Sequence, residues 1–375
     1  MASRLPAEVL CPIFQEIYNS RPKSRPHEQY RDLFSCLMVN RFWCRNVISY
    51  IWSSVFTPHS PVRYGAIDKY ISCLSPSKLE VLTYAGVQLT NVPSTPPIFD
   101  YPAFLKSLRF EIFLRDVFDW CHEHDSSQYH DLVIKALIEL FAERGARLET
   151  FEMKFVDKKA FPGYREKLER LNLNFICEDR FRSLFCNIKK LWLGKDAIES
   201  TGLAERISWI CNNVEYMTLD FTRSSTWFNV FSIPKRYNIS SLIRSQTALQ
   251  SFVLINYSDG TPDFIFSLPT QSHSLRNIYF CQVYFRHFPP LSFVSECGNL
   301  ESLTFRDCFD ITPELVEPLL LNTWTKLEYV YVTPSFHHSE LYYRGQMRTC
   351  ESLERWANEF SNKGKLWENN SVHLS

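Results

Sequence analysis

One short pattern of apolar and variable positions recurs along most of the chain: apolar-x-x-apolar-x-apolar. Nine copies begin at residues 79, 105, 148, 188, 214, 249, 275, 300 and 327, and five of the eight intervals between them are 25–27 residues long. Stretches with a helical pattern separate several copies, at 132–142, 203–211, 242–247 and 313–321. The pattern therefore predicts a strand followed by a returning helix, many times over. Strands connected in this way are parallel, and the helices lie outside the sheet.

The length of these units and their pattern of apolar positions resemble those of leucine-rich repeats, which are roughly 20–29 residues long. The resemblance implies an α/β solenoid with parallel strands on its concave face and helices outside. One such unit cannot bury its apolar face alone, whereas stacked units bury a continuous core. The irregular region 111–187 would hold insertions or a degenerate repeat, and 347–360 is predicted to form a last helix that closes the array.

Alternate residues of each predicted strand point away from the helices, toward the open face. Aromatic and charged side chains at such positions are candidates for target binding, because these types dominate interface hot spots. The candidates are Trp192, Tyr216, Tyr279, Arg306, Tyr329 and Tyr331. Eight strand spacings of about 4.8 Å predict a face roughly 38 Å long, which suits a protein or peptide better than a small molecule. The alternative is a solvated sheet whose aromatic residues reflect strand propensity alone.

The first fifty residues follow a different pattern, with apolar residues at helical spacing. The first predicted helix begins at Pro6, and its apolar face is formed by Val9, Leu10, Ile13, Phe14 and Ile17. A polar loop at 19–31, which contains two prolines, ends this helix. A second short helix is predicted at 33–38, and Asn40 is a good N-cap for a third helix that carries Trp43, Val47 and Ile51.

Over residues 3–55 the chain resembles an F-box. The resemblance rests on two halves and a closing tryptophan: Leu5-Pro6-x-Glu8-Val9-Leu10-x-x-Ile13-Phe14, Asp32-Leu33-x-x-Cys36-x-x-Val39-Asn40-Arg41-x-Trp43-Cys44, and Ile51-Trp52. It implies docking onto a Skp-type adaptor, and through it onto a cullin–RING ubiquitin ligase. The positions that match the family's adaptor surface are Leu5, Pro6, Val9, Leu10, Ile13, Phe14, Val39 and Trp43. The loop at 19–31 is longer and more basic than in the family, and the alternative is that these residues only form the core of a helical cap.

Composition narrows the expected partners. The chain has 41 basic and 41 acidic residues, so its formal net charge is zero, which argues against a bulk attraction to nucleic acid or to anionic membranes. It has no signal-peptide pattern and no apolar run of about 18 residues, so we expect no membrane segment. Its twelve cysteines are scattered, mostly in apolar runs, as is typical of reduced thiols in the cytoplasm or nucleus.

The sequence offers little catalytic chemistry. Cys121, His122, Glu123, His124 and Asp125 form the densest group of possible metal ligands. Adjacent residues point in different directions, and the His-x-His spacing does not place two ligands on one helical face, so a polar surface patch is the favoured interpretation. Phosphate-binding, dinucleotide and hydrolase motifs are absent from the sequence. We therefore expect no cofactor, no metal and no enzymatic activity, with a metal-dependent hydrolase using Cys121, His122 and His124 as a rival hypothesis.

The sequence thus predicts an F-box at 1–56 and a leucine-rich-repeat domain at 57–375, whose last part, 335–375, is a cap and tail. The predicted function is the substrate-recognition subunit of an SCF-type cullin–RING ubiquitin ligase, with an unknown protein as its target. Such a subunit acts by holding the target close to a transferring subunit. The alternative is an interaction scaffold of the same architecture without a role in ubiquitylation.

Overall fold

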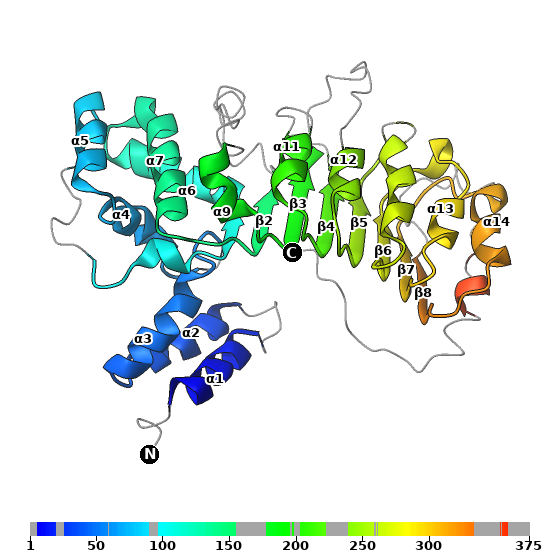
Figure 1. The fold of residues 1–375 in the computed structure, drawn as a ribbon, viewed down its shortest axis with the longest axis horizontal. Helices are drawn as coiled ribbons and strands as arrows, with labels where there is room; N and C mark the ends of the chain where they lie inside the picture. Colours follow the sequence, from blue (N-terminus) through cyan, green and yellow to red (C-terminus); the bar gives the residue numbers. More distant parts are fainter. Residues whose placement is uncertain are drawn as a thin grey trace, which may run out of the picture. The chain divides into compact units, whose positions relative to one another are not determined.

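A computed structural model of the chain describes residues 6–19, 26–58, 60–89, 97–154, 178–195, 197–198, 203–222, 239–258, 260, 262–333, 353 and 355–358. The fold is α/β, and its strands follow one another from β1 to β8 in an eight-stranded parallel sheet (Figure 1). The parallel sheet with outer helices was predicted from the sequence and is confirmed. The chain divides into two compact units, 1–152 with 179–187 and 371–375, and 153–178 with 188–370.

The first unit contains most of the long helices. Its elements are α1 (Ala7–Asn19), α2 (Pro26–Leu37), α3 (Arg41–Trp52), the 3-10 helix η2 (Arg63–Gly65), α4 (Ala66–Ile71), α5 (Pro76–Ala85), η3 (Tyr101–Phe104), β1 (Ser107–Arg109), α6 (Phe110–Glu123), η4 (Ser127–Tyr129), α7 (His130–Glu143), β2 (Thr150–Met153), η6 (Asp179–Phe181) and α9 (Arg182–Phe185). The long interval between the second and third copies of the repeat pattern therefore holds two helices, α6 and α7.

The three helices predicted in the first fifty residues are present as α1, α2 and α3. Asn40 caps α3 as predicted, because its side-chain oxygen accepts a hydrogen bond from the N–H of Trp43 at 2.9 Å. The predicted loop at 19–31 is too long, since α2 already begins at Pro26. Proline fits the first turn of a helix because its missing N–H would have no partner there.

The end of α3 is part of the core of the first unit. The Trp52 ring lies 5.5 Å from the Tyr70 ring and 4.1 Å from the Tyr101 ring. Phe56 is fully buried, with its ring 5.0 Å from that of Phe113. The carbonyl of Ser53 accepts hydrogen bonds from two backbone N–H groups at the start of β1. The predicted domain boundary at residue 56 consequently falls inside one compact unit.

The first copy of the repeat pattern, at 79–84, is a helix and not a strand. Ser75 caps this helix, α5, by accepting from the N–H of Lys78, and Pro76 occupies its first turn. Gly86 ends it in a left-handed conformation, with a φ of 106°. The three apolar positions of the pattern are also compatible with helical spacing, so the capping residues decide the outcome.

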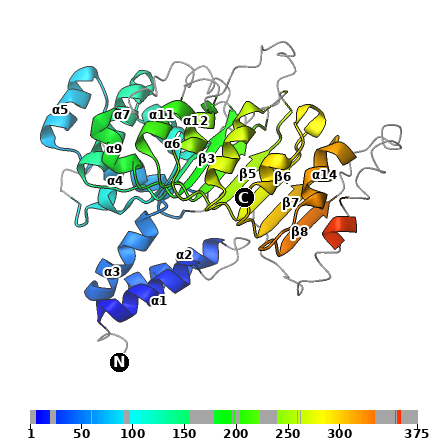
Figure 2. The same cartoon turned by 45° about the vertical axis from the view of Figure 1, so that its right-hand side comes forward.

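The second unit follows the predicted repeat closely. Its elements are β3 (Lys190–Gly194), α11 (Leu203–Ile210), β4 (Tyr216–Asp220), α12 (Ile239–Arg244), β5 (Ser251–Ile255), η7 (Asp263–Gln271), β6 (Asn277–Cys281), η8 (Phe285–His287), α13 (Ser292–Ser295), β7 (Ser302–Arg306), α14 (Pro313–Leu321) and β8 (Tyr329–Thr333). Each strand begins two residues after the start of a predicted copy. The helices of this unit lie on one face of its strands (Figure 2).

Buried amide side chains connect successive helical segments of the second unit. The Gln246 side chain donates to the carbonyl of Cys211 and accepts from the N–H of Val214, at 2.9 and 3.0 Å. The Gln271 side chain donates in turn to the carbonyls of Ile243 and Gln246, at 3.0 and 2.9 Å. These bonds satisfy backbone groups that the short helices leave without partners.

Two further sequence predictions concern the C-terminal part of the chain and the absence of a membrane-spanning segment. Most of the predicted cap and tail at 335–375 lies outside the described residues, although 353 and 355–358, within the predicted last helix, are helical. In the part of the chain that the structure describes, no helix combines the length and the apolar character needed to cross a membrane.

Candidate interaction surfaces

Helices α1 and α3 run side by side and divide the predicted adaptor residues into two groups. The Phe14 ring lies 5.3 Å from the Trp43 ring, and the Tyr18 hydroxyl is 2.6 Å from the Ser54 hydroxyl. Leu10 and Phe14 are fully buried. They therefore form core between the helices, so the inclusion of these two residues in a docking surface is corrected here.

The exposed residues of α1 lie one position earlier in the helix. Val9 and Ile13 are 44% and 41% exposed, although each is next in sequence to a buried residue. One residue corresponds to about 100° around a helix, so the pair 9 and 13 presents a different face from the pair 10 and 14. Pro6 is also exposed, whereas Leu5 lies outside the described residues.

The corner between α2 and α3 adds three exposed apolar side chains. Val39 is 48% exposed, as its predicted role requires, and Met38 and Phe42, which the sequence prediction of the surface missed, are 85% and 42% exposed. The signal for the last two was their position next to the Asn40 cap, where the chain turns between two helices. We call Val9, Ile13, Met38, Val39 and Phe42 the N-terminal apolar patch. Trp43, half-buried, lies beside it.

The second surface is the strand face that points away from the helices in the second unit. The parallel register aligns its residues in three rows across β3–β8: Lys190, Tyr216, Ser251, Asn277, Ser302, Tyr329; Trp192, Thr218, Val253, Tyr279, Thr304, Tyr331; and Gly194, Asp220, Ile255, Cys281, Arg306, Thr333. We call these residues the inner face. All six predicted target-binding residues belong to it, and the alternate strand residues, such as Leu191 and Leu193, are buried.

The exposed side chains of the inner face gather at its two ends. Lys190 and Tyr216 are exposed on β3 and β4, and Arg306, Tyr329 and Tyr331 are exposed on β7 and β8. Lys190 lies over the Tyr216 ring at 5.5 Å, and the rings of Tyr329 and Tyr331 stack 6.0 Å apart. Such cation–π and stacked arrangements fix side chains that would otherwise be mobile.

Half-buried Trp192 and Tyr279 have charged neighbours that position them. The Lys154 ammonium lies 4.6 Å from the Trp192 ring and 2.7 Å from a carboxylate oxygen of Asp220. Burial raises the pKa of Tyr279, and its hydrogen bond with Arg306 opposes this rise. The same bond raises the pKa of Arg306. Both residues therefore keep their protons at neutral pH.

Gly194 makes room for the lysine. A β-carbon on this residue would lie 3.1 Å from the α-carbon of Lys154, which is closer than almost any neighbour tolerates. A side chain at this position would push the Lys154 backbone away from the sheet, and with it the ammonium that neutralises Asp220. The glycine is thus explained by close approach and not by an unusual φ.

Cys121, His122 and His124 do not form a metal site. Cys121 is buried and His122 is exposed, while the His124 ring stacks on Trp120 at 4.2 Å. Among the described residues, no group of three histidine, cysteine or acidic side chains could hold a metal ion. The hydrolase hypothesis therefore lacks its ligand set in the described part of the chain.

The cysteine environments do not favour nucleophilic chemistry either. Burial raises the pKa of Cys73 to about 11 and that of Cys297 to about 12. Burial also raises the pKa of Cys281, which belongs to the inner face. The thiolate is the reactive form, so these three thiols are protonated and unreactive at neutral pH.

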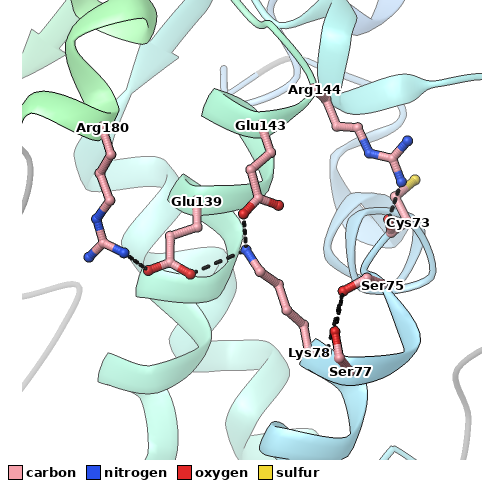
Figure 3. A network of polar contacts seen from close by, with 8 residues as sticks. All are labelled: Cys73, Ser75, Ser77, Lys78, Glu139, Glu143, Arg144 and Arg180. Carbon is pink, nitrogen blue, oxygen red and sulfur yellow. Dashed lines mark hydrogen bonds and ion pairs between the residues drawn. The ribbon is translucent and has the colours of Figure 1, made fainter.

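A network of charged side chains on α7 has a structural role (Figure 3). Lys78 contacts Glu139 at 3.2 Å and Glu143 at 2.7 Å, and Arg180 contacts Glu139 at 2.7 Å. The Arg144 guanidinium donates to the carbonyl of Cys73 at 2.9 Å. Lys78 is shared by two carboxylates and Glu139 by two cations, so the network connects α5 and η6 to α7.

Comparison of the chain with family models, with curated proteins and with solved structures found no match. The functional interpretation therefore rests on the two surfaces themselves.

Proposed function

We propose that this protein is the substrate-recognition subunit of an SCF-type cullin–RING ubiquitin ligase. The N-terminal apolar patch binds a Skp-type adaptor, and the inner face of the second unit binds the target protein. The chain itself catalyses nothing, because its role is to raise the effective concentration of the target at the transferring subunit.

The observation that carries this proposal is the division of α1 into two apolar faces. Leu10 and Phe14 already supply the contact with α3, so Val9 and Ile13 are not needed for the core of the isolated chain. Exposed apolar side chains that gather on a small helical unit are typical of a protein-binding surface. Three of the patch residues, Val9, Ile13 and Val39, are among the positions that the F-box resemblance assigns to adaptor contact.

Adaptor binding is tested by co-purification of the full chain with a Skp-type adaptor. We expect Val9→Asp combined with Ile13→Asp to abolish binding, because a charge replaces each apolar contact, while the thermal midpoint of unfolding stays close to that of the wild type. Val81→Asp is the matched control, since Val81 is 58% exposed on α5, away from the patch. Failure of the wild type to bind the adaptor would refute the proposal.

The ligase role is separated from the scaffold alternative by reconstitution. The protein is combined with adaptor, cullin, RING subunit and a bound target, and ubiquitin transfer to the target is measured. Transfer that is lost with the Val9→Asp and Ile13→Asp variant supports the ligase role. Adaptor binding without transfer to a bound target would favour the scaffold.

A further inference from the structure

The inner face carries charges of one sign on its surface. Among its described residues the cations are Lys190 and Arg306, and both are exposed. Its one carboxylate is that of Asp220, which is 1% exposed and pairs with Lys154. The exposed charges of the inner-face residues themselves are therefore positive, and one neighbouring carboxylate, that of Asp307, lies 3.7 Å from the Arg306 guanidinium.

The uncharged polar groups of the inner face are hydroxyls and an amide, which can donate as well as accept a hydrogen bond. Burial raises the pKa of Tyr279 and of Tyr329, so their phenols stay protonated at neutral pH, and the phenol of Tyr279 is already hydrogen-bonded with Arg306 and Cys281. Tyr331 stacks on Tyr329 and presents a hydroxyl beside it. Exposed tyrosines next to single cations bind anionic groups and cover the apolar parts of the same partner.

The distance between the two cations indicates what kind of anion is bound. Lys190 is in the first row on β3 and Arg306 is in the third row on β7, so they are four strand spacings apart across the sheet and four residues apart along it. These offsets of roughly 19 Å and roughly 13 Å correspond to a separation of about 23 Å. A phosphate group is usually held by several cations at one point, whereas these cations are isolated from each other. Two separate carboxylates on one polypeptide fit the spacing. An extended segment covers about 23 Å in seven residues.

We propose that the inner face binds an extended acidic segment of the target, with two aspartate or glutamate residues about seven positions apart. One carboxylate pairs with Lys190 beside Tyr216, and the other pairs with Arg306, which is hydrogen-bonded to Tyr279. The residues between them cross the half-buried middle of the sheet. This inference rests on the proposed function only in taking the inner face as the target-binding surface.

The test is selection of a random peptide library on the full-length wild-type chain. Enriched peptides should carry two acidic residues about seven positions apart. Their affinity, measured by fluorescence anisotropy, should fall about tenfold with Arg306→Gln or Lys190→Gln, because each variant removes a charged hydrogen bond. The affinity should also fall as sodium chloride is raised from 50 to 300 mM, by about threefold or more.

Matched substitutions control for the loss of charge alone. Arg286→Gln and Lys326→Gln change exposed residues of the same types outside the inner face, and both should leave peptide affinity unchanged. A peptide with glutamine in place of both acidic residues should bind at least tenfold more weakly. Thermal unfolding of each variant confirms that the fold is retained.

Three results would overturn the inference: no enriched peptide, enriched peptides without paired acidic residues, or peptides that bind the Arg306→Gln and Lys190→Gln variants as tightly as the wild type. Displacement of an enriched peptide by a uridine 20-mer, together with tighter binding of that RNA, would also contradict it in favour of nucleic acid.

The Val9→Asp and Ile13→Asp variant should keep peptide binding, and the inner-face variants should keep adaptor binding. Failure of the acidic segment and failure of the ligase proposal are therefore distinguishable.

Discussion

Tyr70 shows how a single polar atom limits the stability of the first unit. It is fully buried, with its ring 4.9 Å from that of Phe141 and 5.9 Å from that of Phe56. Its hydroxyl has no hydrogen-bond partner in the described part of the chain. A buried unsatisfied hydroxyl costs about 1–3 kcal/mol, so Tyr70→Phe should raise the free energy of unfolding by about 1 kcal/mol, measured by urea denaturation.

The same substitution should change the dependence of stability on pH. Burial raises the pKa of Tyr70 well above its usual range, so above a pH of about 10 the phenol ionises in the unfolded state before it does so in the folded state. The unfolded state then binds fewer protons, and stability falls as pH rises. Tyr70→Phe should lose less stability between pH 9 and 10.5 than the wild type. Tyr84→Phe, at a residue 96% exposed, should show neither effect, and equal pH slopes for Tyr70→Phe and wild type would contradict the explanation.

Among the elements, the short helical segments of the second unit depend on the buried amides. Gln246→Leu removes a donor and an acceptor at once and leaves the carbonyl of Cys211 and the N–H of Val214 without their partners. Each unpaired group costs about 1–3 kcal/mol, so we expect the free energy of unfolding to fall by about 2–4 kcal/mol. Gln250→Leu, at a half-buried residue of the same unit, is the control and should change it by less than about 1 kcal/mol. Equal effects of the two substitutions in urea denaturation would show that the amide bonds do not carry this stability.

The strands of the second unit could be predicted from the sequence because one local pattern coincides with one structural role. In each copy from 188 to 327 the two later apolar positions lie within the strand, and in the copies from 188 to 300 both are buried, as with Leu191 and Leu193. The copy at 79–84 has the same pattern but lies between Ser75 with Pro76 and Gly86, which start and end a helix. The pattern is thus compatible with either element, and the caps decide.

The candidate surfaces were harder to predict than the strands. The inner-face residues followed directly from alternation along each strand. On α1, however, Val9, Leu10, Ile13 and Phe14 are all apolar, and the sequence does not say which pair meets α3. The partner helix decides this, through the contact of Phe14 with Trp43. Tertiary packing therefore separates core from surface where the sequence alone leaves a broad apolar face.

At the scale of the whole chain, the N-terminal helices and the start of the sheet form one folding unit. Trp52 is 6% exposed and packs on Tyr70 and Tyr101. The carbonyl of Ser53 accepts from the N–H groups of Lys106 and Ser107, both at 2.9 Å. Removal of residues 1–55 would take away Trp52 and so expose the rings of Tyr70 and Tyr101. It would also leave the N–H groups of Lys106 and Ser107, next to β1, without their acceptor.

A chain that lacks residues 1–55 should therefore be less stable than the full chain, beyond the loss of three helices. Exposing one large aromatic contact costs about 1.5–3 kcal/mol, and each unpaired N–H adds about 1–3 kcal/mol. We expect a lower urea midpoint for the truncated chain and faster hydrogen exchange at the amides of Lys106 and Ser107, whereas exchange in β5 and β6 should be unchanged. The Val9→Asp and Ile13→Asp variant, which alters only exposed residues of α1, should exchange like the wild type at all these positions. Wild-type protection of Lys106 and Ser107 in the truncated chain would mean that the first helices are an independent domain. If the expected loss of protection is found, the point substitutions, and not the truncation, are the variants with which adaptor binding can be separated from target binding.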